Sequence, residues 1–350
     1  MCFISGKDIK VIIMKEFLGA TILSMVLAFA LTAVLGPMFI SWLHKLKYGQ
    51  EIREEGPAWH QKKSGTPTMG GIMFITGIGT SVLINLATTL IMGNMDPIIL
   101  KSVILFAVSL GFGAIGFVDD YIKVVKKRNL GLTAIQKFLL QLAFAAAYVV
   151  IMYLMGMLKT TVVIPFVKYG VELPMWLYIP FVMFVVVGTV NAVNLTDGLD
   201  GLASSVTVIV SLFFAVYSFF KLSQTGVSIY AMAIAGGLLG FLIFNKYPAK
   251  VFMGDTGSLF LGGAIALIAA DLNMHIYLII VGFVYFAETL SVIMQTAYFK
   301  YTKKKYGEGR RIFKMTPIHH HFEMMNWKET KIVSVFSAVT LLLCIVAYFG

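Results

Sequence analysis

The chain has few charged residues and almost no cysteine. Only 13% of its 350 residues are charged, 17 are Asp or Glu, and two are Cys. A soluble domain carries about 25% charged residues, so the composition argues against an ordinary soluble protein. The two cysteines, Cys2 and Cys344, lie at opposite ends of the sequence, and we therefore expect neither a disulfide framework nor a cysteine-based zinc site.

Long polar segments are also scarce, whereas apolar runs recur along the whole chain. Hydrophobic residues make up 59% of the sequence, and its mean hydropathy is +0.86. About 20 apolar residues cross a hydrocarbon core as a helix, and a helix satisfies its own backbone hydrogen bonds. We therefore predict an all-α polytopic membrane protein with about ten transmembrane helices, at 17–43, 69–92, 98–118, 133–157, 175–195, 201–221, 229–245, 257–271, 275–299 and 329–349.

The pattern predicts a single integral membrane domain over 1–350, with no separate soluble domain. The main polar loops are 44–67 and 300–327, and a short segment at 1–16 precedes the first span. That segment has no clear signal-peptide cleavage pattern, and Met14 is an alternative start. The spans 229–245 and 257–271 are short, so they are either tilted, partly re-entrant or wrongly bounded.

Lysine and arginine define the expected orientation. Ten crossings divide the loops into two sets, and one set holds only Lys7, Lys10, Lys15, Lys101, Lys159, Lys168 and Lys221 of the 28 basic residues. The positive-inside rule places the richer set, with loops 44–67 and 300–327, in the cytoplasm and both termini outside. The net charge of +11 fits this topology and anionic lipid, or an anionic substrate. Nucleic acid is not expected, because the basic residues are scattered over membrane loops.

Five aspartates share one predicted depth, at the cytoplasmic mouth. They come from three segments, GFVDDYIK, NAVNLTDGLDG and VFMGDTGS, and are Asp119, Asp120, Asp197, Asp200 and Asp255. Any one of them alone would suit a solvated loop. Together, in Gly-rich and otherwise apolar sequence, they indicate a functional site, because ionisable groups near hydrocarbon are costly.

Clustered carboxylates raise one another's pKa unless a cation neutralises them, and oxygen ligands favour Mg²⁺ or Mn²⁺ over zinc. Mg²⁺ keeps waters that phosphate can replace, so a carboxylate site beside lysines predicts phosphoryl chemistry. The chain has no GxxxxGK[ST] loop. We expect the amides that begin a helix near Asp255 to face a phosphate.

Basic side chains accompany the acids. Lys63 precedes the turn at GTPTMGG, Lys123 follows the Asp pair on the same helix face if the helix continues, and Lys137 lies one turn inside its helix. Lys137 either serves the site or snorkels to the interface. The histidines of PIHHHFE either donate hydrogen bonds to phosphate or sit in a solvated loop.

Glu288 stands alone in the middle of a predicted span, within VGFVYFAETLSV. An isolated intramembrane carboxylate is a candidate functional residue. A structural hydrogen bond to a neighbouring helix is the alternative, and the sequence leaves both open.

Five motifs together resemble the signatures of the phospho-N-acetylmuramoyl-pentapeptide transferase family, also called translocase I. They are GTPTMGG (65–71), GFVDDYIK (116–123), NAVNLTDGLDG (191–201), FNKYPAKVFMGDTGS (244–258) and PIHHHFE (317–323). The resemblance implies Mg²⁺-dependent transfer of phospho-N-acetylmuramoyl-pentapeptide from UDP-N-acetylmuramoyl-pentapeptide to undecaprenyl phosphate. The products would be lipid I and UMP, in peptidoglycan and cell-wall biogenesis at the bacterial plasma membrane. It also implies ten helices, a homodimer, and inhibition by uridine nucleosides such as tunicamycin.

The resemblance also assigns residues. Asp255 matches the Mg²⁺ ligand and, with Asp119 and Asp120, the catalytic set. The loop Gly198–Leu199–Asp200, with Asn245 and Phe252, matches the uridine pocket. Other matched substrate or inhibitor contacts are Lys63, Thr68, Lys123, Lys137, Asn194, Asp197, Ser258, Gln295, His319, His320 and His321.

Two alternatives stay open from the sequence. The aspartate motifs alone would suit a sister polyprenyl-phosphate N-acetylglucosamine-1-phosphate transferase. An ion-coupled transporter also has polar breaks and buried acids, but near the midplane and between repeats. Here the acids lie at one predicted face, and the chain shows no clear repeat.

Overall fold

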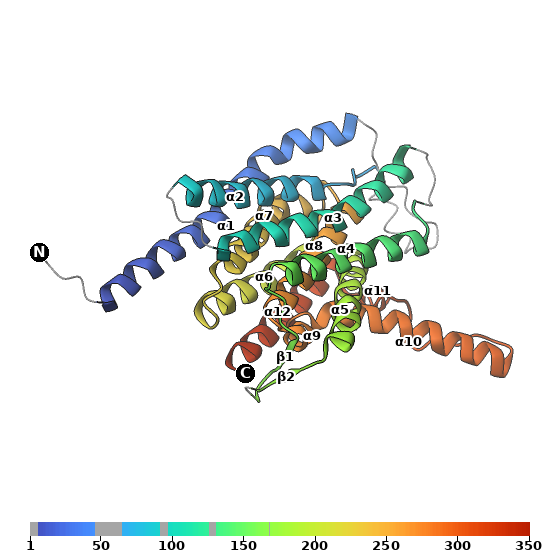
Figure 1. Cartoon of the computed structure of the whole chain (residues 1–350). Coiled ribbons are helices and arrows are strands. Elements are labelled where there is room, and N and C mark those ends of the chain that lie inside the picture. The colour runs from blue at the N-terminus through green and yellow to red at the C-terminus, as the bar shows by residue number, and fades with distance from the viewer. Residues whose placement is uncertain (1–5, 46–64, 92–96, 126–130, 168) are drawn as a thin grey trace, which may run out of the picture.

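The computed structural model describes residues 6–45, 65–91, 97–125, 131–167 and 169–350. These ranges form a bundle of helices with one small hairpin (Figure 1). The helices are α1 (Gly6–Lys45), α2 (Gly71–Ile91), α3 (Pro97–Val125), α4 (Ala134–Leu154), α5 (Met175–Thr196), α6 (Leu202–Phe220), α7 (Thr225–Asn245), α8 (Gly254–Asp271), α9 (His275–Val281), α10 (Phe283–Tyr306), α11 (Ile318–Glu323) and α12 (Glu329–Phe349).

Eight of the described helices are long and apolar enough to cross a membrane, namely α1 from Leu18 onward, α2 to α7 and α12. The expectation of a polytopic helical membrane protein is thereby confirmed. The predicted span 275–299 is instead two helices, α9 and α10, which bend by 82° at Gly282 and make a ninth span if they are counted as one. The predicted span 257–271 corresponds to α8, an 18-residue helix.

The first helix begins earlier than predicted. It starts at Gly6 rather than at 17, because no proline interrupts the sequence between these positions and the helix continues upstream. Pro37 lies inside this helix without ending it. The position of 1–16 relative to the membrane stays a prediction.

The prediction of an all-α chain was wrong in one detail. The strands β1 (Thr161–Ile164) and β2 (Tyr169–Glu172) pair antiparallel, with Val162 opposite Val171. The backbone N–H of Val163 donates to the carbonyl of Asn273 at 3.1 Å, which fastens the hairpin to the connection between α8 and α9. Its β-branched run, TTVVI, was the available sequence signal.

Helix α8 lies at the centre of the bundle. Its residues from Thr256 to Ala270 are all buried, and it packs mainly against α3 and α5. Close approach depends on small residues: a Cβ added to Gly71 would collide with the backbone of Gly257. The first turn of α8 is therefore pressed against α2 and α3, where the motif residues lie.

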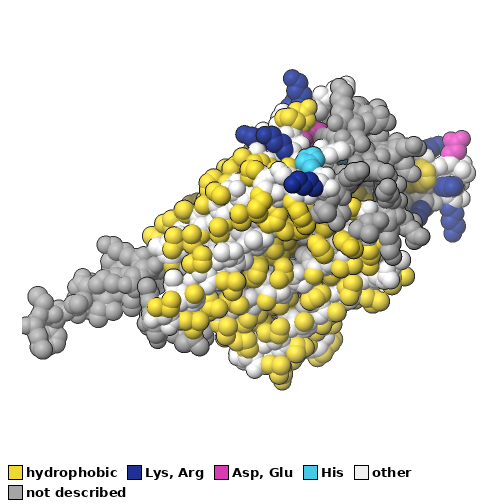
Figure 2. Space-filling view, turned by 90° about the horizontal axis from the view of Figure 1, so that it is seen from above, with side chains coloured by type: hydrophobic (Ala, Val, Ile, Leu, Met, Phe, Trp, Pro, Cys, Tyr) yellow, Lys and Arg dark blue, Asp and Glu magenta, His cyan; other side chains and the backbone are white. Residues whose placement is uncertain are grey.

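The molecular surface is divided by side-chain type. Hydrophobic side chains cover most of the face seen in Figure 2, whereas lysine, arginine and histidine side chains gather toward one end. Large apolar residues such as Leu83, Phe184 and Leu342 are more than half exposed, as lipid-facing side chains would be. The apolar belt and the basic end therefore occupy different parts of the molecule.

Candidate active site

Three aspartates meet where the end of α3 touches the start of α8. Asp119 and Asp120 lie near the C-terminal end of α3, and Asp255 lies in the first turn of α8. One carboxylate oxygen from each residue lies within 4.8 Å of the others. Asp119 and Asp120 are buried, and Asp255 is partly buried.

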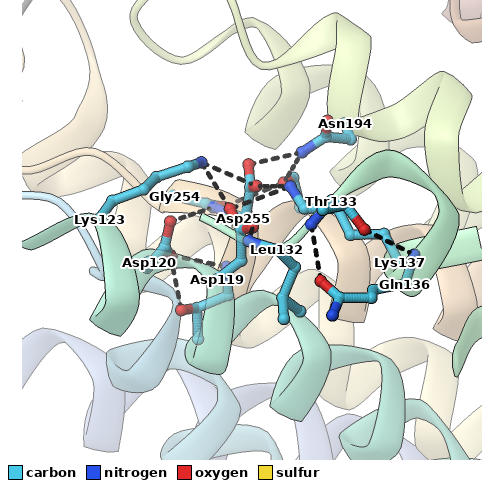
Figure 3. Close-up of polar contacts among 12 residues, drawn as sticks. Asp119, Asp120, Lys123, Leu132, Thr133, Gln136, Lys137, Asn194, Gly254 and Asp255 are labelled. Carbon is cyan, nitrogen blue, oxygen red and sulfur yellow. Dashed lines mark hydrogen bonds and ion pairs between the residues drawn. The ribbon is translucent and has the colours of Figure 1, made fainter. Parts of the chain in front are cut away.

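Two lysines hold this cluster together (Figure 3). The Nζ atom of Lys123 lies 2.6 Å from Asp119 Oδ2 and 3.1 Å from Asp255 Oδ2. The Nζ atom of Lys137 lies 2.9 Å from Asp119 Oδ2 and 2.7 Å from Asp255 Oδ2. Both ammonium groups thus bridge the same two carboxylates, and Lys137 belongs to the site geometry rather than snorkelling away from it.

Asp120 caps the N-terminus of α8. Its Oδ1 accepts from the backbone N–H of Asp255 at 3.2 Å, and its Oδ2 accepts from the N–H and the hydroxyl of Thr256 at 2.9 and 2.7 Å. We expected these amides to face a phosphate, and that expectation was wrong. A carboxylate from α3 satisfies the free donors of the helix and interacts favourably with its dipole.

Two glycines allow the cluster to be this tight. A Cβ at Gly116 would collide with the backbone of Asp255, and one at Gly131 would collide with the side chain of Asp119. Gly116 lies one turn before Asp120, so α3 reaches α8 with its backbone at this point. The spacing of glycine and aspartate in GFVDD therefore serves both packing and chemistry.

The start of α4 is built around Asp119. The carboxylate Oδ1 accepts from the backbone N–H of Leu132 at 2.7 Å. Thr133 is the N-cap of α4 and forms a capping box with Gln136, whose side chain accepts from the N–H of Thr133 at 2.9 Å. Lys137 follows one turn into the helix, so the cap determines where its ammonium group lies.

Asn194 joins α5 to the cluster. Its Nδ2 donates to Asp255 Oδ1 at 3.0 Å and contacts Ser258 Oγ at 2.8 Å. The charges of Lys123 and Lys137 and the amide of Asn194 stabilise the ionised form of Asp255.

The donor set suits a hard divalent cation. Carboxylate oxygens are the protein ligands that Mg²⁺ accepts, and it usually binds one or two carboxylates and retains water. Asp120 is held by donors of α8, whereas Oδ2 of Asp119 and Oδ2 of Asp255 contact lysine ammonium groups, which a cation can replace. We therefore favour these two oxygens as ligands, and the expected assignment of the ion to Asp255 stays a prediction.

The predicted uridine-pocket residues lie near one another but play different parts. Asp200 accepts from the backbone N–H of Ala249 at 2.9 Å and joins the α5–α6 loop to the segment before α8. Both ends of the Asn245 amide are used inside the protein, by Ser204 at 2.9 Å and by the carbonyl of Val251 at 3.0 Å. Asn245 is buried, so its amide serves the packing of α6, α7 and the segment before α8. Phe252 is partly exposed, and Asp197 is the C-cap of α5.

Thr68 is buried beside the start of α8, and Lys63 falls outside the described residues. The Thr68 hydroxyl lies beside Gly254, whose φ of +69° favours glycine and whose added Cβ would lie 2.8 Å from that oxygen. The GTPTMGG motif is therefore brought against the start of α8.

The histidines and Gln295 form a separate group, on α10 and α11. Gln295 Oε1 accepts from the N–H groups of Ile312 and Phe313 at 2.9 and 3.1 Å, so it fastens the chain after α10. His320 Nδ1 lies 2.6 Å from Glu323, and His321 Nδ1 accepts from the N–H of Lys314 at 3.1 Å. His319 contacts Glu288. The three rings have different partners, as their adjacent positions predict.

Several residues of the site were not predicted from the sequence. Thr256, Leu132 and Thr133 all contact the aspartates or position them. Thr256 directly follows Asp255 in the GDTGS motif, so its place in the motif was a usable signal. Leu132 contributes only a backbone N–H, which no side-chain pattern reveals.

The chain was compared with known proteins. A model described as glycosyl transferase family 4 matches residues 102–273, and one described as phospho-N-acetylmuramoyl-pentapeptide-transferase signature 1 matches residues 63–75. The chain is 49% identical to the phospho-N-acetylmuramoyl-pentapeptide-transferase of Clostridium botulinum (strain Alaska E43 / Type E3) over 335 residues, which cover 95% of this chain and 98% of that protein. Relatives of the same name in Clostridium beijerinckii and Listeria monocytogenes serotype 4b are each 48% identical. They cover 98% and 91% of this chain, and 99% and 94% of their own lengths.

Proposed function

This chain belongs to the phospho-N-acetylmuramoyl-pentapeptide transferase family, and on that premise we propose its reaction. Undecaprenyl phosphate attacks the β-phosphate of UDP-N-acetylmuramoyl-pentapeptide, and UMP leaves. The lipid product is lipid I, an intermediate of peptidoglycan synthesis. The chain is a multi-pass bacterial membrane protein, so the acceptor lipid and the enzyme share one phase.

One observation carries the proposal: three carboxylates and two ammonium groups from three helices meet at one point of the bundle. The reaction brings two anionic phosphates together and releases a third anionic group. Cationic groups that are already in place lower that repulsion and stabilise the charge that develops on the leaving group. Lys123 and Lys137 are positioned for this role by carboxylates that are themselves fixed by helix caps.

Asp119 and Asp255 would hold Mg²⁺, with Asp120 fixing the backbone of Asp255. When bound, the ion supplies Lewis-acid stabilisation of phosphoryl oxygens. The three carboxylates carry one more charge than the two lysines balance, which favours an added cation. We assign the remaining contacts as the resemblance does: the Gly198–Asp200 loop with Asn245 and Phe252 takes uridine, and Lys63, Thr68, Ser258, Gln295 and the histidines surround the substrates.

The orientation follows from the same basic residues. We propose that the cluster lies at the cytoplasmic face of a ten-helix fold with both termini outside, because loops around the site carry most lysines and arginines. A site there reaches a soluble nucleotide and a membrane lipid together. Homodimer formation and inhibition by tunicamycin belong to the same proposal.

Asp119 is proposed to position the reactants rather than to remove a proton. The second pKa of a phosphate monoester is about 6, so most lipid phosphate is a dianion at pH 7 and needs no general base. Asp119 accepts from the N–H of Leu132 and faces both ammonium groups, which suits a positioning role. The rate of Asp119→Asn should stay low from pH 6 to 9, and full recovery at high pH would refute this role.

A covalent route is the alternative mechanism, in which an aspartate attacks first and forms a phospho-sugar enzyme. Initial-velocity plots with both substrates varied decide between the two routes. Intersecting lines support direct attack, whereas parallel lines and a trapped adduct would support the covalent enzyme.

One assay tests the function itself. The purified protein, Mg²⁺, undecaprenyl phosphate and labelled UDP-N-acetylmuramoyl-pentapeptide should release UMP and form labelled lipid. Turnover of UDP-N-acetylglucosamine instead would move the chain to the sister branch. Lack of UMP release from either nucleotide would remove the enzyme assignment and favour the transporter.

A further inference from the structure

Glu288 is a buried carboxylate that the proposed reaction does not use. It lies one turn into α10, and its side chain has no exposed surface. An ionised carboxylate at such a place is costly unless a partner balances it. In this structure the partner comes from α11: His319 Nδ1 lies 3.1 Å from Glu288 Oε1, and the backbone N–H of His319 donates to Oε2 at 3.3 Å.

A second side chain on the same face of α10 holds the same segment. Gln295 lies seven residues after Glu288, which is two helical turns, so both side chains project from one side. Gln295 binds the backbone of Ile312 and Phe313, and Glu288 binds residue 319. The helix thus fastens the stretch that leads to α11 at both ends, and His319 cannot shift without losing the contact with Glu288.

The other ring nitrogen of His319 faces the α5–α6 loop. A Cβ at Gly198 would collide with Nε2 of His319, so the loop backbone lies directly against the imidazole. Among the described residues, neither ring nitrogen of His319 forms a hydrogen bond, so the approach of Nδ1 to Glu288 Oε1 is a close polar contact; the His319 side chain is only 1% exposed. Four residues earlier on the same chain segment, Asn194 binds Asp255. The end of α5 and its C-cap, four residues in all, therefore separate the contact with His319 from the carboxylate cluster.

We propose that Glu288 is a positioning residue for nucleotide binding. It holds the His319 imidazole against Gly198 and thereby fixes the shape of the Gly198–Asp200 loop. This inference rests on the proposed function, because it needs that loop to bind the nucleotide. In the part of the chain that the structure describes, the contacts of Glu288 and His319 include each other and Gly198 but not the carboxylate cluster, so the pair acts on the affinity for the nucleotide rather than on the transfer step.

The Glu288 carboxylate can orient His319 because both of its oxygens approach that residue from a fixed place on α10. A carboxylate beside one ring nitrogen of a histidine restricts the orientation of the ring, as in other carboxylate–histidine pairs. The second oxygen of Glu288 fastens the backbone of the same residue, so ring and chain are held together. Gln at position 288 keeps the shape and one acceptor but loses the charge.

The test compares Glu288→Gln, His319→Asn and the double variant with the wild type. The measurements are kcat, KM for each substrate, the Kd of UMP by calorimetry, and Tm. Glu288→Gln should raise the nucleotide KM and the Kd of UMP about ten-fold. We expect kcat and the KM for undecaprenyl phosphate to stay within about three-fold. Because the carboxylate acts through the ring, the double variant should bind UMP no more weakly than His319→Asn alone.

Ser291→Ala is the matched control, since Ser291 is buried on the same helix and its hydroxyl donates to the backbone carbonyl of Glu288, away from the carboxylate. It should leave the nucleotide KM unchanged. If Glu288→Gln does not fold, Gly198→Ala tests the same contact from the loop side and should weaken UMP binding similarly.

A fall in kcat with an unchanged nucleotide KM would overturn the proposal, as would additive losses in the double variant. A lowered Tm with equal losses for both substrates would overturn it too, in favour of a merely structural role. Failure of the proposed function is distinguishable, because the wild type would then release no UMP from the muramoyl nucleotide.

Discussion

Helices α3 and α8 carry charged groups at both of their contact ends, and the two ends differ in kind. At one end, Asp119, Asp120 and Asp255 meet Lys123 and Lys137. At the other end, Lys101 pairs with Asp271 at 3.1 Å and donates to Gln224 at 3.2 Å. The helices are antiparallel, because the C-terminal end of each meets the N-terminal end of the other.

The difference separates a balanced ion pair from an unbalanced cluster. One carboxylate and one ammonium group between α3 and α8 neutralise each other, and a buried pair of this kind fixes how two helices meet. Three carboxylates with two ammonium groups leave an excess negative charge and a reason to bind a cation and phosphates. The contact between α3 and α8 therefore has a structural ion pair at one end and the proposed reactive cluster at the other.

The largest expected effect on kcat comes from comparing an Asp→Asn substitution at the start of α8 with one at its end. Asp255→Asn should lower kcat by at least about 10³-fold, because Asp255 is both the proposed metal ligand and the partner of two lysines, and Asn carries no charge. Asp271→Asn, the matched variant on the same helix, should keep kcat within about two-fold. Steady-state UMP release measures both, and more than about a tenth of wild-type activity in Asp255→Asn would contradict the assignment.

The lysines provide the second comparison. Lys137→Gln should lower kcat/KM about 10²-fold, because one of two bridging ammonium groups is lost. Lys101→Gln should change kcat/KM little. Equal losses in both variants would mean that Lys137 serves stability in the way that Lys101 does, and the snorkelling alternative would return.

For the free energy of unfolding we expect the reverse order, with Lys101 mattering more than Lys137. Lys101→Met leaves the buried carboxylate of Asp271 without its cation, at a cost of about 3 kcal/mol, and should lower Tm by about 5 °C. Replacing both partners, in Lys101→Met with Asp271→Leu, should recover most of that loss because no buried charge remains. A Tm of the double variant below that of the single variant would argue against this account of the pair.

The smallest effect is expected at the start of α4. Thr133→Ala removes the capping box that places Lys137, which costs about 1 kcal/mol of helix stability. We expect kcat/KM to fall by about two- to five-fold with a small change in Tm. Thr76→Ala is the control, since its hydroxyl binds only the carbonyl of Ile72 within its own helix. An unchanged kcat/KM would show that the cap does not affect the site.

The sequence was a good guide to the aspartates and a poor guide to what each one does. Five aspartates from three segments predicted a shared depth, and the structure brings three of them, Asp119, Asp120 and Asp255, into one cluster. It could not predict that Asp120 caps α8, because that depends on how closely α3 approaches a helix more than 130 residues away. The same limit applies to Glu288, whose partner lies 31 residues further along the chain.

The helix boundaries were also predicted only in part from the sequence. Apolar runs predicted most spans, since any segment in lipid must satisfy its own backbone hydrogen bonds. The bend between α9 and α10 was not predicted, because the run 275–299 is long and mostly apolar and reads as one span, with no proline at Gly282 to mark a break. The hairpin lies outside the predicted spans, where strand and loop residues look alike in a short segment.

The amino-acid sequence by itself determined that this is a polytopic helical membrane protein, and which motifs carry its chemistry. Hydropathy and residue type are local properties, and lipid and phosphate act on them directly. Only the tertiary structure decided which carboxylate pairs with which lysine, that an aspartate caps α8, and that Glu288 reaches His319. Those contacts join residues that are distant along the chain, so they exist only after the helices have packed.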